Sequence, residues 1–282
     1  MTTSPPLFAP KVIIMGPAGT GKTYSIGTLV DSGVEVFYLA IESGLEALLG
    51  YWTDRGKPIP PNLHWHKIEP AKASFKELAE YSVKVNTLAL ETLAKMVDVN
   101  RHMHNLFTKI LESMNNFHDD RTEKDFGPVD EWGTGRAIVI DGLTGVSKAA
   151  MALVTGGKPV KSQSDYQLAM NQIENFLRLC CDHCPCWFVL IAHVEREVDE
   201  VLGGVKITVA SLGRKLPPLI PPMFSDVILA VREGTRWTWD LTSSQADTKA
   251  RNLPWAANIP QDFRPIVATW AARATAATVT AG

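Results

Sequence analysis

Short apolar runs alternate along the chain with stretches whose apolar residues recur at helical spacing. The runs predict buried strands at 12–15, 34–41, 137–141 and 187–192. Helices are expected between them, one ending near Asp31 and others later in the chain. Buried strands that alternate with helices are typical of a parallel sheet joined by right-handed crossovers. The pattern therefore predicts an α/β fold in which helices flank a mostly parallel central sheet.

The pattern changes toward the carboxyl end. Residues 227–231 and 235–241 are two apolar-rich runs separated by Glu233 and Gly234, which predicts a hairpin that extends the parallel core with antiparallel strands. A further helix is expected at 166–181, directly before the strand at 187–192. The final segment, 271–282, is rich in alanine and threonine and has no capping signals, so we expect a weakly ordered tail.

Two segments interrupt the strand and helix alternation. Residues 71–118 carry apolar side chains at helical spacing among charges, which predicts a helical insertion after the second strand. Residues 119–135 are charged and glycine-rich and are expected to form a mobile surface loop. We expect one domain over 1–270 that contains both segments.

Length, composition and charge narrow the class of protein. A chain of 282 residues with 45% hydrophobic content can bury a full core in one domain. Its net charge of -2 provides no general attraction for nucleic acid, so any DNA contact must come from local loops. No segment predicts a secretion signal or a membrane span, and we expect a cytoplasmic protein, in the host cytoplasm if a phage encodes it.

The 4 cysteines are clustered, which raises the question of a metal site. Cys180, Cys181, Cys184 and Cys186 surround His183 at a predicted junction between a helix and a strand. Structural zinc sites usually pair two separated knuckles of cysteines, and this cluster does not. Buried thiols in a reducing compartment are the simpler interpretation, so we expect no zinc.

A phosphate-binding pattern directly follows the first predicted strand. The residues Gly16, Pro17, Ala18, Gly19, Thr20, Gly21, Lys22 and Thr23 complete the pattern G-x-x-x-x-G-K-[ST], and Tyr24 follows them. Such a loop turns its backbone N–H groups toward phosphate oxygens, and the helix that follows adds its positive end. Lys22 would reach the β and γ phosphates, and Thr23 would bind magnesium. These residues predict a site for ATP with Mg2+.

A second magnesium ligand is expected at the end of the strand at 137–141. Asp141 follows four apolar residues, as does the carboxylate that emerges beside the nucleotide in many ATPases. Because magnesium in such a site is completed by a carboxylate, Asp141 becomes a strong candidate once the phosphate loop is present.

The order of these motifs resembles the RecA-like ATPase core, over roughly residues 10 to 255. Within that group the chain is most similar to compact phage nucleotide-binding proteins related to RecA, some of which anneal single strands during recombination. The resemblance implies that Glu42, at the end of the second strand, orients and deprotonates the attacking water, with Glu46 as a second candidate. It also implies that His193 senses the γ phosphate. The alternatives are that Glu42 caps a turn and that His193 is a satisfied polar group.

The resemblance further implies that Lys249 and Arg251 act in a neighbouring subunit's nucleotide site. Two cations at alternate positions of an extended segment point to the same side and could neutralise charge on the γ phosphate. The protein would then be a homo-oligomer, either a ring or a filament, with nucleotide at the subunit interface. The alternative is two solvated charges in a surface loop.

In the family, the DNA-binding loops follow the Asp141 strand and the His193 strand. The first would be residues 155–162, a basic and glycine-rich segment with an aromatic residue behind it. The second, 195–215, begins with acidic residues that would weaken DNA binding unless they face away. The candidate DNA contacts are Lys158, Lys161, Tyr166, Lys206, Arg214 and Lys215.

These features favour an ATP-dependent, RecA-like phage recombination protein that binds single-stranded DNA and promotes annealing or strand pairing, with ATPase activity that can be weak. One alternative is a ring-forming motor such as a helicase or packaging accessory. Another is a nucleotide-dependent switch or kinase without DNA. The kinase is the least favoured, because only Arg121 precedes Arg136 in the segment where an arginine-rich lid would be expected.

Overall fold

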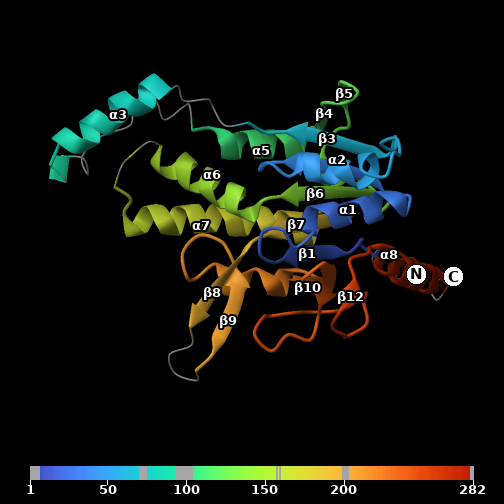
Figure 1. Ribbon diagram of the computed structural model, residues 1–282. Helices are drawn as coiled ribbons and strands as arrows, with labels where there is room; N and C mark the ends of the chain where they lie inside the picture. The colour runs from blue at the N-terminus through green and yellow to red at the C-terminus, as the bar shows by residue number, and fades with distance from the viewer. Residues whose placement is uncertain are drawn as a thin grey trace, which may run out of the picture.

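The computed structural model describes residues 7–69, 75–89, 91–92, 104–156, 158, 160–198 and 203–279. Its centre is an eight-stranded sheet in the order β12-β11-β10-β1-β7-β6-β2-β3 (Figure 1). The strands are β1 (Lys11–Met15), β2 (Glu35–Ala40), β3 (Leu63–Lys67), β6 (Arg136–Asp141), β7 (Trp187–Ala192), β10 (Asp226–Glu233), β11 (Arg236–Asp240) and β12 (Ile259–Pro260). The predicted mostly parallel α/β fold is confirmed.

The hairpin predicted at the carboxyl end forms as β10 and β11 and extends the parallel core as expected, and its first strand is itself part of that core. β10 runs parallel to β1, with Val12 opposite Asp226, so it belongs to the parallel core. Antiparallel pairing begins only between β10 and β11 and continues to β12. The long connection from β7 to β10 carries the chain back to the edge where β1 starts, which makes the parallel direction possible.

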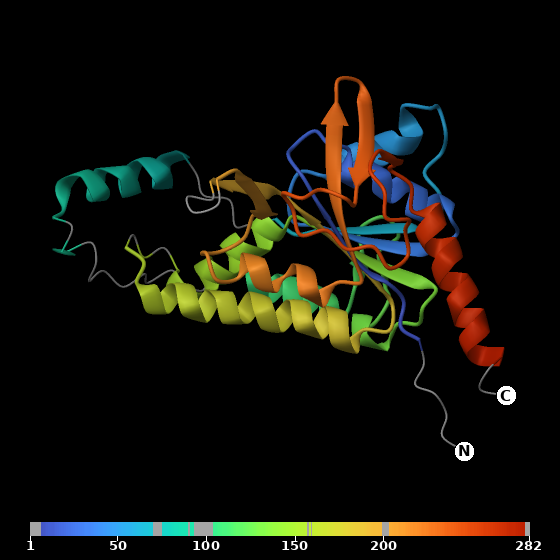
Figure 2. The ribbon, with the colours of Figure 1, turned by 90° about the horizontal axis from the view of Figure 1, so that it is seen from below.

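Helices cover both faces of the sheet, as Figure 2 shows from below. One face packs against α5 (Leu106–Asn115), α6 (Leu143–Thr155) and α7 (Gln163–Arg178), through buried residues such as Phe107 and Ile173. The other face packs against α1 (Lys22–Asp31), α2 (Leu45–Thr53) and α8 (Arg264–Val279), through Leu29 and Ile266. Because both faces are covered, the central strands are apolar throughout, which explains the continuous runs in the sequence.

The segment predicted as a helical insertion is helical where it is described. It contains α3 (Phe75–Thr87) and α5, and the residues around 93–103 lie outside the described part. It follows β3, not β2. Neither α2 nor β3 is predicted by the pattern of apolar residues. β3 has the sequence LHWHK, in which histidines and a lysine interrupt any apolar run.

The segment 119–135, expected to be a loop, contains a short hairpin of β4 (His118–Asp119) and β5 (Lys124–Asp125) and a 3-10 turn at Val129–Glu131. Asp119 is fully buried and accepts hydrogen bonds from the backbone of Trp65 and Arg121. Trp132 is also buried. These contacts attach the segment to β3, which its charged composition did not indicate.

Two more elements differ from the expectation. Residues of the second loop form a separate hairpin of β8 (Val194–Val198) and β9 (Val205–Val209), immediately after β7. The alanine-rich end is helical through Val279 as part of α8, since alanine is the best helix former; residues 280–282 of the predicted tail lie outside the described part. In the described residues, no helix is both long and apolar enough for a bilayer crossing.

Candidate functional site

The phosphate loop lies between the end of β1 and the start of α1, as the sequence predicted. Gly19 and Gly21 have φ values of 75° and 79°, in the left-handed region that favours glycine. A side chain at Gly16 would place its Cβ 2.6 Å from the Ala230 carbonyl oxygen of β10. The glycines of the pattern are therefore required by backbone shape and by close packing.

The loop presents free donors and a buried ammonium group. Among the described residues, the backbone N–H groups of Gly19, Thr20 and Gly21 make no hydrogen bond. Lys22 Nζ donates to the carbonyl oxygens of Gly16 and Pro17, at 2.8 and 2.7 Å. Burial lowers the pKa of Lys22 to about 8, against the raising effect of Asp141 and Glu42. Unpaired N–H groups beside a desolvated ammonium group fit a triphosphate.

Thr23 and Asp141 meet beside this loop. The Thr23 hydroxyl donates to Asp141 Oδ2 over 2.8 Å. Burial raises the pKa of Asp141, although hydrogen bonds and Lys22 oppose that rise. A hydroxyl and a carboxylate are hard oxygen ligands of the kind magnesium prefers, so this pair fits the metal that a triphosphate brings.

Tyr38 is a part of this site that the sequence motifs did not predict. Its buried hydroxyl on β2 donates to the same oxygen, Asp141 Oδ2. A Cβ at Gly44 would lie 2.0 Å from that oxygen and 2.4 Å from the Tyr38 hydroxyl, so only glycine fits above the pair. The available signal was a phenol in an otherwise apolar strand, because a buried hydroxyl needs a hydrogen-bond partner.

Glu42 and His193 face each other across the same edge of the sheet. His193 Nε2 lies 3.7 Å from Glu42 Oε2, and their side chains are 42% and 31% exposed. Glu42 also packs against the amino end of α6, where Cβ atoms at Gly142 and Gly145 would come within 2.6 and 3.3 Å of its side chain. The positive end of that helix favours a carboxylate. Glu46, the second candidate for this role, lies in the first turn of α2.

The grouping follows from the sheet. β1, β2, β6 and β7 are parallel neighbours, so the residues that follow their carboxyl ends meet at one edge. The structure therefore brings together the phosphate loop, Glu42, Asp141 and His193. Tyr24, the residue after the loop, packs edge-on against Tyr51 of α2 with ring centroids 5.0 Å apart.

Lys249 and Arg251 lie at the opposite edge. Lys249 forms a backbone bridge with Val227 near the start of β10, and its Nζ donates to the Phe224 carbonyl oxygen over 2.7 Å. The Arg251 backbone N–H donates to Asp226. Asp226 and Val227 stand opposite Val12 and Ile13 of β1. These positions lie three to four residues before the phosphate loop, which is roughly 10–13 Å at about 3.3 Å per residue. Neither cation reaches the nucleotide loop of its own chain.

The candidate DNA contacts lie around the amino end of α7 and beyond β9. Lys161 and Tyr166 are exposed, whereas Lys158 forms an ion pair with Asp165 at 3.1 Å. Gly157 and Pro159 of this loop lie outside the described residues. In the second segment, Arg214 and Lys215 are exposed and Lys206 lies 3.6 Å from Asp247.

The acidic start of the second segment is only partly described. Glu195 and Glu197 are exposed on β8, and Glu197 pairs across the hairpin with Lys206. Opposite charges at facing positions offset each other. The turn of the hairpin, including Asp199 and Glu200, lies outside the described residues.

The four cysteines are buried at a π-helical turn, Leu179–His183, and at the start of β7. Lys11 Nζ donates there to the carbonyl oxygens of Cys184 and Cys186. In the described part of the chain, no group of three or more histidine, cysteine or acidic residues has the geometry to hold a metal ion.

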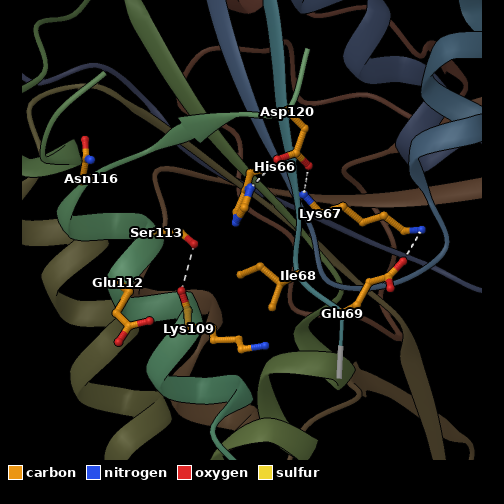
Figure 3. A pocket seen from close by; sticks show the side chains of 9 residues that line it. All are labelled: His66, Lys67, Ile68, Glu69, Lys109, Glu112, Ser113, Asn116 and Asp120. Atoms are coloured by element: carbon orange, nitrogen blue, oxygen red, sulfur yellow. Dashed lines mark hydrogen bonds and ion pairs between the residues drawn. The ribbon is translucent and has the colours of Figure 1, made fainter. Parts of the chain in front are cut away.

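A hollow of about 740 Å3 lies away from this site, between the end of β3 and α5 (Figure 3). Most of its charged groups are paired with one another. His66 bonds to Asp120 at 2.7 Å, and Lys67 bonds to Glu69 at 2.7 Å. No residue of the phosphate loop lines it, so the candidate nucleotide site is the open sheet edge and not this hollow.

One comparison with known proteins gives a match. The sequence model of a family described as AAA domain matches residues 9–252. The matched part contains the phosphate loop, every strand of the central sheet except β12, and both Lys249 and Arg251. No match was found among curated proteins.

Proposed function

The chain belongs to the AAA domain family, and from that premise we propose that it is a RecA-like recombination ATPase that binds single-stranded DNA. The family supports the coarser statement that this is a nucleotide-binding ATPase core. Our proposal adds that nucleotide controls DNA contact, and that the bound strands are annealed or paired. A phage source is part of the same proposal.

The observation that carries the proposal is the attachment of the second loop to the strand of His193. The Ala210 backbone N–H donates to the His193 carbonyl oxygen over 2.8 Å, and Ala210 lies four residues before Arg214 and Lys215, an exposed pair. A shift of His193 toward a γ phosphate would therefore pull on the segment that carries these cations. Such a short covalent and hydrogen-bonded link is a physical means of coupling two sites.

Helix α6 supplies a second link. Its amino end packs against Glu42, and its carboxyl end at Thr155 leads into the loop that carries Lys158 and Lys161. On the way, Ser147 Oγ lies 3.3 Å from Ser211 Oγ of the second segment. A helix is stiff, so movement at its nucleotide end is transmitted to its loop end.

The two candidate DNA segments also approach each other. A Cβ at Gly213 would lie 3.1 Å from the Met170 sulfur on α7, one turn after exposed Tyr166. Arg214 and Lys215 thus directly follow a residue that packs on the helix presenting the aromatic ring, one turn away from that ring. Cations beside an exposed ring suit a single strand, whose phosphates attract the cations and whose bases stack on the ring.

The residues of the site suit hydrolysis. Lys22 and the free N–H groups of the loop would bind the phosphates, and Glu42 would orient the attacking water and accept its proton. Magnesium, held by Thr23 and Asp141, would neutralise charge on the phosphate oxygens. His193 at 3.7 Å from Glu42 would link the presence of the γ phosphate to the position of the base.

The proposal is tested with the full chain and a fluorescent single-stranded oligonucleotide. We expect a mobility shift with a non-hydrolysable ATP analogue and magnesium, a weaker shift without nucleotide, and binding that falls steeply with salt. The double variant Arg214→Ala, Lys215→Ala should weaken DNA binding while nucleotide binding stays unchanged. Absence of a shift at low salt would reject the DNA role and leave a nucleotide switch.

A strand-pairing assay separates annealing from a motor. Annealing needs only DNA-bound protein, so complementary strands should pair with the non-hydrolysable analogue. A helicase or packaging accessory would displace a strand only when ATP is hydrolysed. Displacement with ATP and no pairing with the analogue would replace our proposal with the motor.

A further inference from the structure

The phosphate loop is held from outside by side chains that come from the far end of the sequence. Trp237 Nε1, on β11, donates to the Gly19 carbonyl oxygen over 3.1 Å. Gln261 Nε2 donates to the Thr20 carbonyl oxygen over 2.8 Å and to the Thr238 carbonyl oxygen over 3.0 Å. The two side chains therefore attach the loop to β11 and to the segment before α8.

The contact is tight as well as polar. A Cβ at Gly21 would lie 2.5 Å from Gln261 Oε1 and 3.2 Å from Trp237 Cδ1. The side chains thus pack directly on the backbone at Gly21, where any larger residue would push them away. Gly21 is therefore required for packing as well as for its left-handed conformation.

The direction of these bonds matters for phosphate binding. In a trans peptide unit, the carbonyl of one residue and the N–H of the next point in opposite directions. Donors that hold the carbonyls of Gly19 and Thr20 from outside therefore turn the N–H groups of Thr20 and Gly21 the other way. Those two N–H groups are among the unpaired donors of the loop.

The carbonyl oxygens of Gly16 and Pro17 are held from within the loop, by Lys22 Nζ and, at Pro17, also by the Thr20 hydroxyl at 2.8 Å. Lys22 Nζ holds Gly16 and Pro17, but an ammonium group that binds phosphate must give up at least part of these bonds. Trp237 and Gln261 donate to the carbonyl oxygens of Gly19 and Thr20, and Gln261 donates in addition to Thr238 of β11. These bonds leave the N–H groups of the loop free, so both side chains can stay in place when nucleotide binds. They are suited to fix the conformation before binding as well as after it.

We propose that Trp237 and Gln261 form a latch on the phosphate loop, positioning its backbone N–H groups for the phosphates of the nucleotide. The inference rests on the proposed nucleotide site and extends it to residues outside the phosphate-loop pattern. The latch acts through the loop backbone, so both are positioning residues. It also ties the loop to β11 and to the chain that leads into α8.

The expected effect is a loss of affinity. When a donor is removed, a smaller fraction of the protein has its loop in the binding conformation. The apparent affinity falls in proportion to that fraction. The loss of one such hydrogen bond corresponds to about a 5- to 10-fold weaker Kd. Once phosphates are bound they hold the N–H groups themselves, so kcat should stay within about twofold.

The test uses Trp237→Phe, which keeps an aromatic ring beside Arg232 and loses the donor, and Gln261→Met, which keeps length and loses both donors. Trp255→Phe is the matched control, because Trp255 is 62% exposed and makes no hydrogen bond to the loop. Three quantities are measured: the Kd for a fluorescent ATP analogue with magnesium, KM and kcat, and amide hydrogen exchange across residues 16–23.

Both test variants should show weaker binding, a raised KM and nearly unchanged kcat. Exchange in the loop should be faster without nucleotide and return to the wild-type level at saturation. The control should match wild type. Unchanged Kd and exchange in both folded variants would overturn the latch, as would a fall in kcat with Kd unchanged. If the wild-type protein binds no nucleotide, the proposed function fails. The latch is then judged from amide exchange alone, and faster exchange of residues 16–23 in the two variants would still support it.

Discussion

The Thr23 hydroxyl donates a hydrogen bond to Asp141 Oδ2, which joins the first turn of α1 to the end of β6. These residues are 118 positions apart in sequence, and Tyr38 donates to the same oxygen from β2. The carboxylate is thus held in place from two sides. A preorganised oxygen ligand lowers the cost of binding magnesium with a triphosphate.

The first prediction concerns this carboxylate. Asp141→Asn keeps the shape of the side chain and removes its charge, so magnesium should no longer strengthen nucleotide binding. We expect ATP turnover to fall by about 100-fold or more, because a ligand of the metal that stabilises the transition state is lost. Asp182→Asn, a change at an exposed position on the π-helical turn, is the control. The measurement is a magnesium titration of nucleotide affinity; an unchanged magnesium dependence would contradict the role of Asp141.

The second prediction follows from the lowered pKa of Lys22, about 8. Above pH 8 the free protein holds this amine mostly neutral, whereas a bound phosphate favours the charged form and raises its pKa again. Nucleotide binding at pH 8.5 should therefore take up protons, and binding at pH 7 should take up far fewer.

Calorimetry in buffers of different ionisation enthalpy measures this uptake. The signal should depend on buffer at pH 8.5 and nearly lose that dependence at pH 7. Arg replaces Lys without titrating in this range, so Lys22→Arg, if it retains nucleotide binding, should show no uptake from this position. Equal uptake at the two pH values would contradict the lowered pKa.

The third prediction concerns Gly145 on α6. A Cβ there would lie 2.7 Å from Ile41 Cγ2 and 3.3 Å from Glu42 Cγ, so alanine must displace the segment that carries Glu42. Turnover in Gly145→Ala should fall about 10- to 100-fold, as expected for a misplaced catalytic group, while nucleotide affinity stays close to wild type. Gly133→Ala is the control, because nothing lies within 4 Å of its added carbon.

The free energy of unfolding separates a displaced Glu42 from a general loss of folding. Alanine is favoured over glycine inside a helix by about 1 kcal/mol, which offsets part of the strain. Denaturant unfolding should therefore show a small change for Gly145→Ala. The interpretation would be wrong if turnover stayed normal or if lost turnover were matched by lost folding.

The sequence predicted the parts of the site that follow directly from strand ends. Asp141 and His193 each follow a continuous apolar run, and the phosphate loop follows β1, so a parallel sheet brings them together. Tyr38, Trp237 and Gln261 could not be found in this way. Their roles depend on partners over 100 positions away, and only the packed structure brings those partners into contact.

Some strands and helices were likewise not predictable from the sequence pattern. The hairpin of β8 and β9 has an alternating pattern of acidic, basic and apolar residues, which reads equally well as a loop. The helix α8 lacks a clear apolar face, so the spacing of its apolar residues did not predict a helix. Its alanines favour a helix through backbone preference and not through burial. Residues of α8 near its start still anchor it: Ile266 is fully buried.

Arg251 provides the last prediction, because it lies at the sheet edge away from its own phosphate loop. Within the described residues its guanidinium group makes no hydrogen bond or ion pair, whereas Lys249 is engaged with the Phe224 carbonyl oxygen. If the proposed interface exists, Arg251 is the cation free to enter a neighbouring nucleotide site, and Arg251→Ala should reduce turnover without reducing nucleotide affinity.

Mixing two impaired variants tests whether this contribution crosses the interface. Arg251→Ala keeps its own phosphate loop, and Lys22→Ala keeps the arginine, so some interfaces in a mixture regain both groups. At equal amounts and random assembly, about a quarter of the interfaces pair an intact loop with an intact arginine, since each has a one-half chance. Turnover should therefore recover to about a quarter of wild type, whereas mixing Arg251→Ala with the double variant should recover none. Recovery no greater than the sum of the two separate variants would mean that Arg251 does not act in a neighbouring subunit.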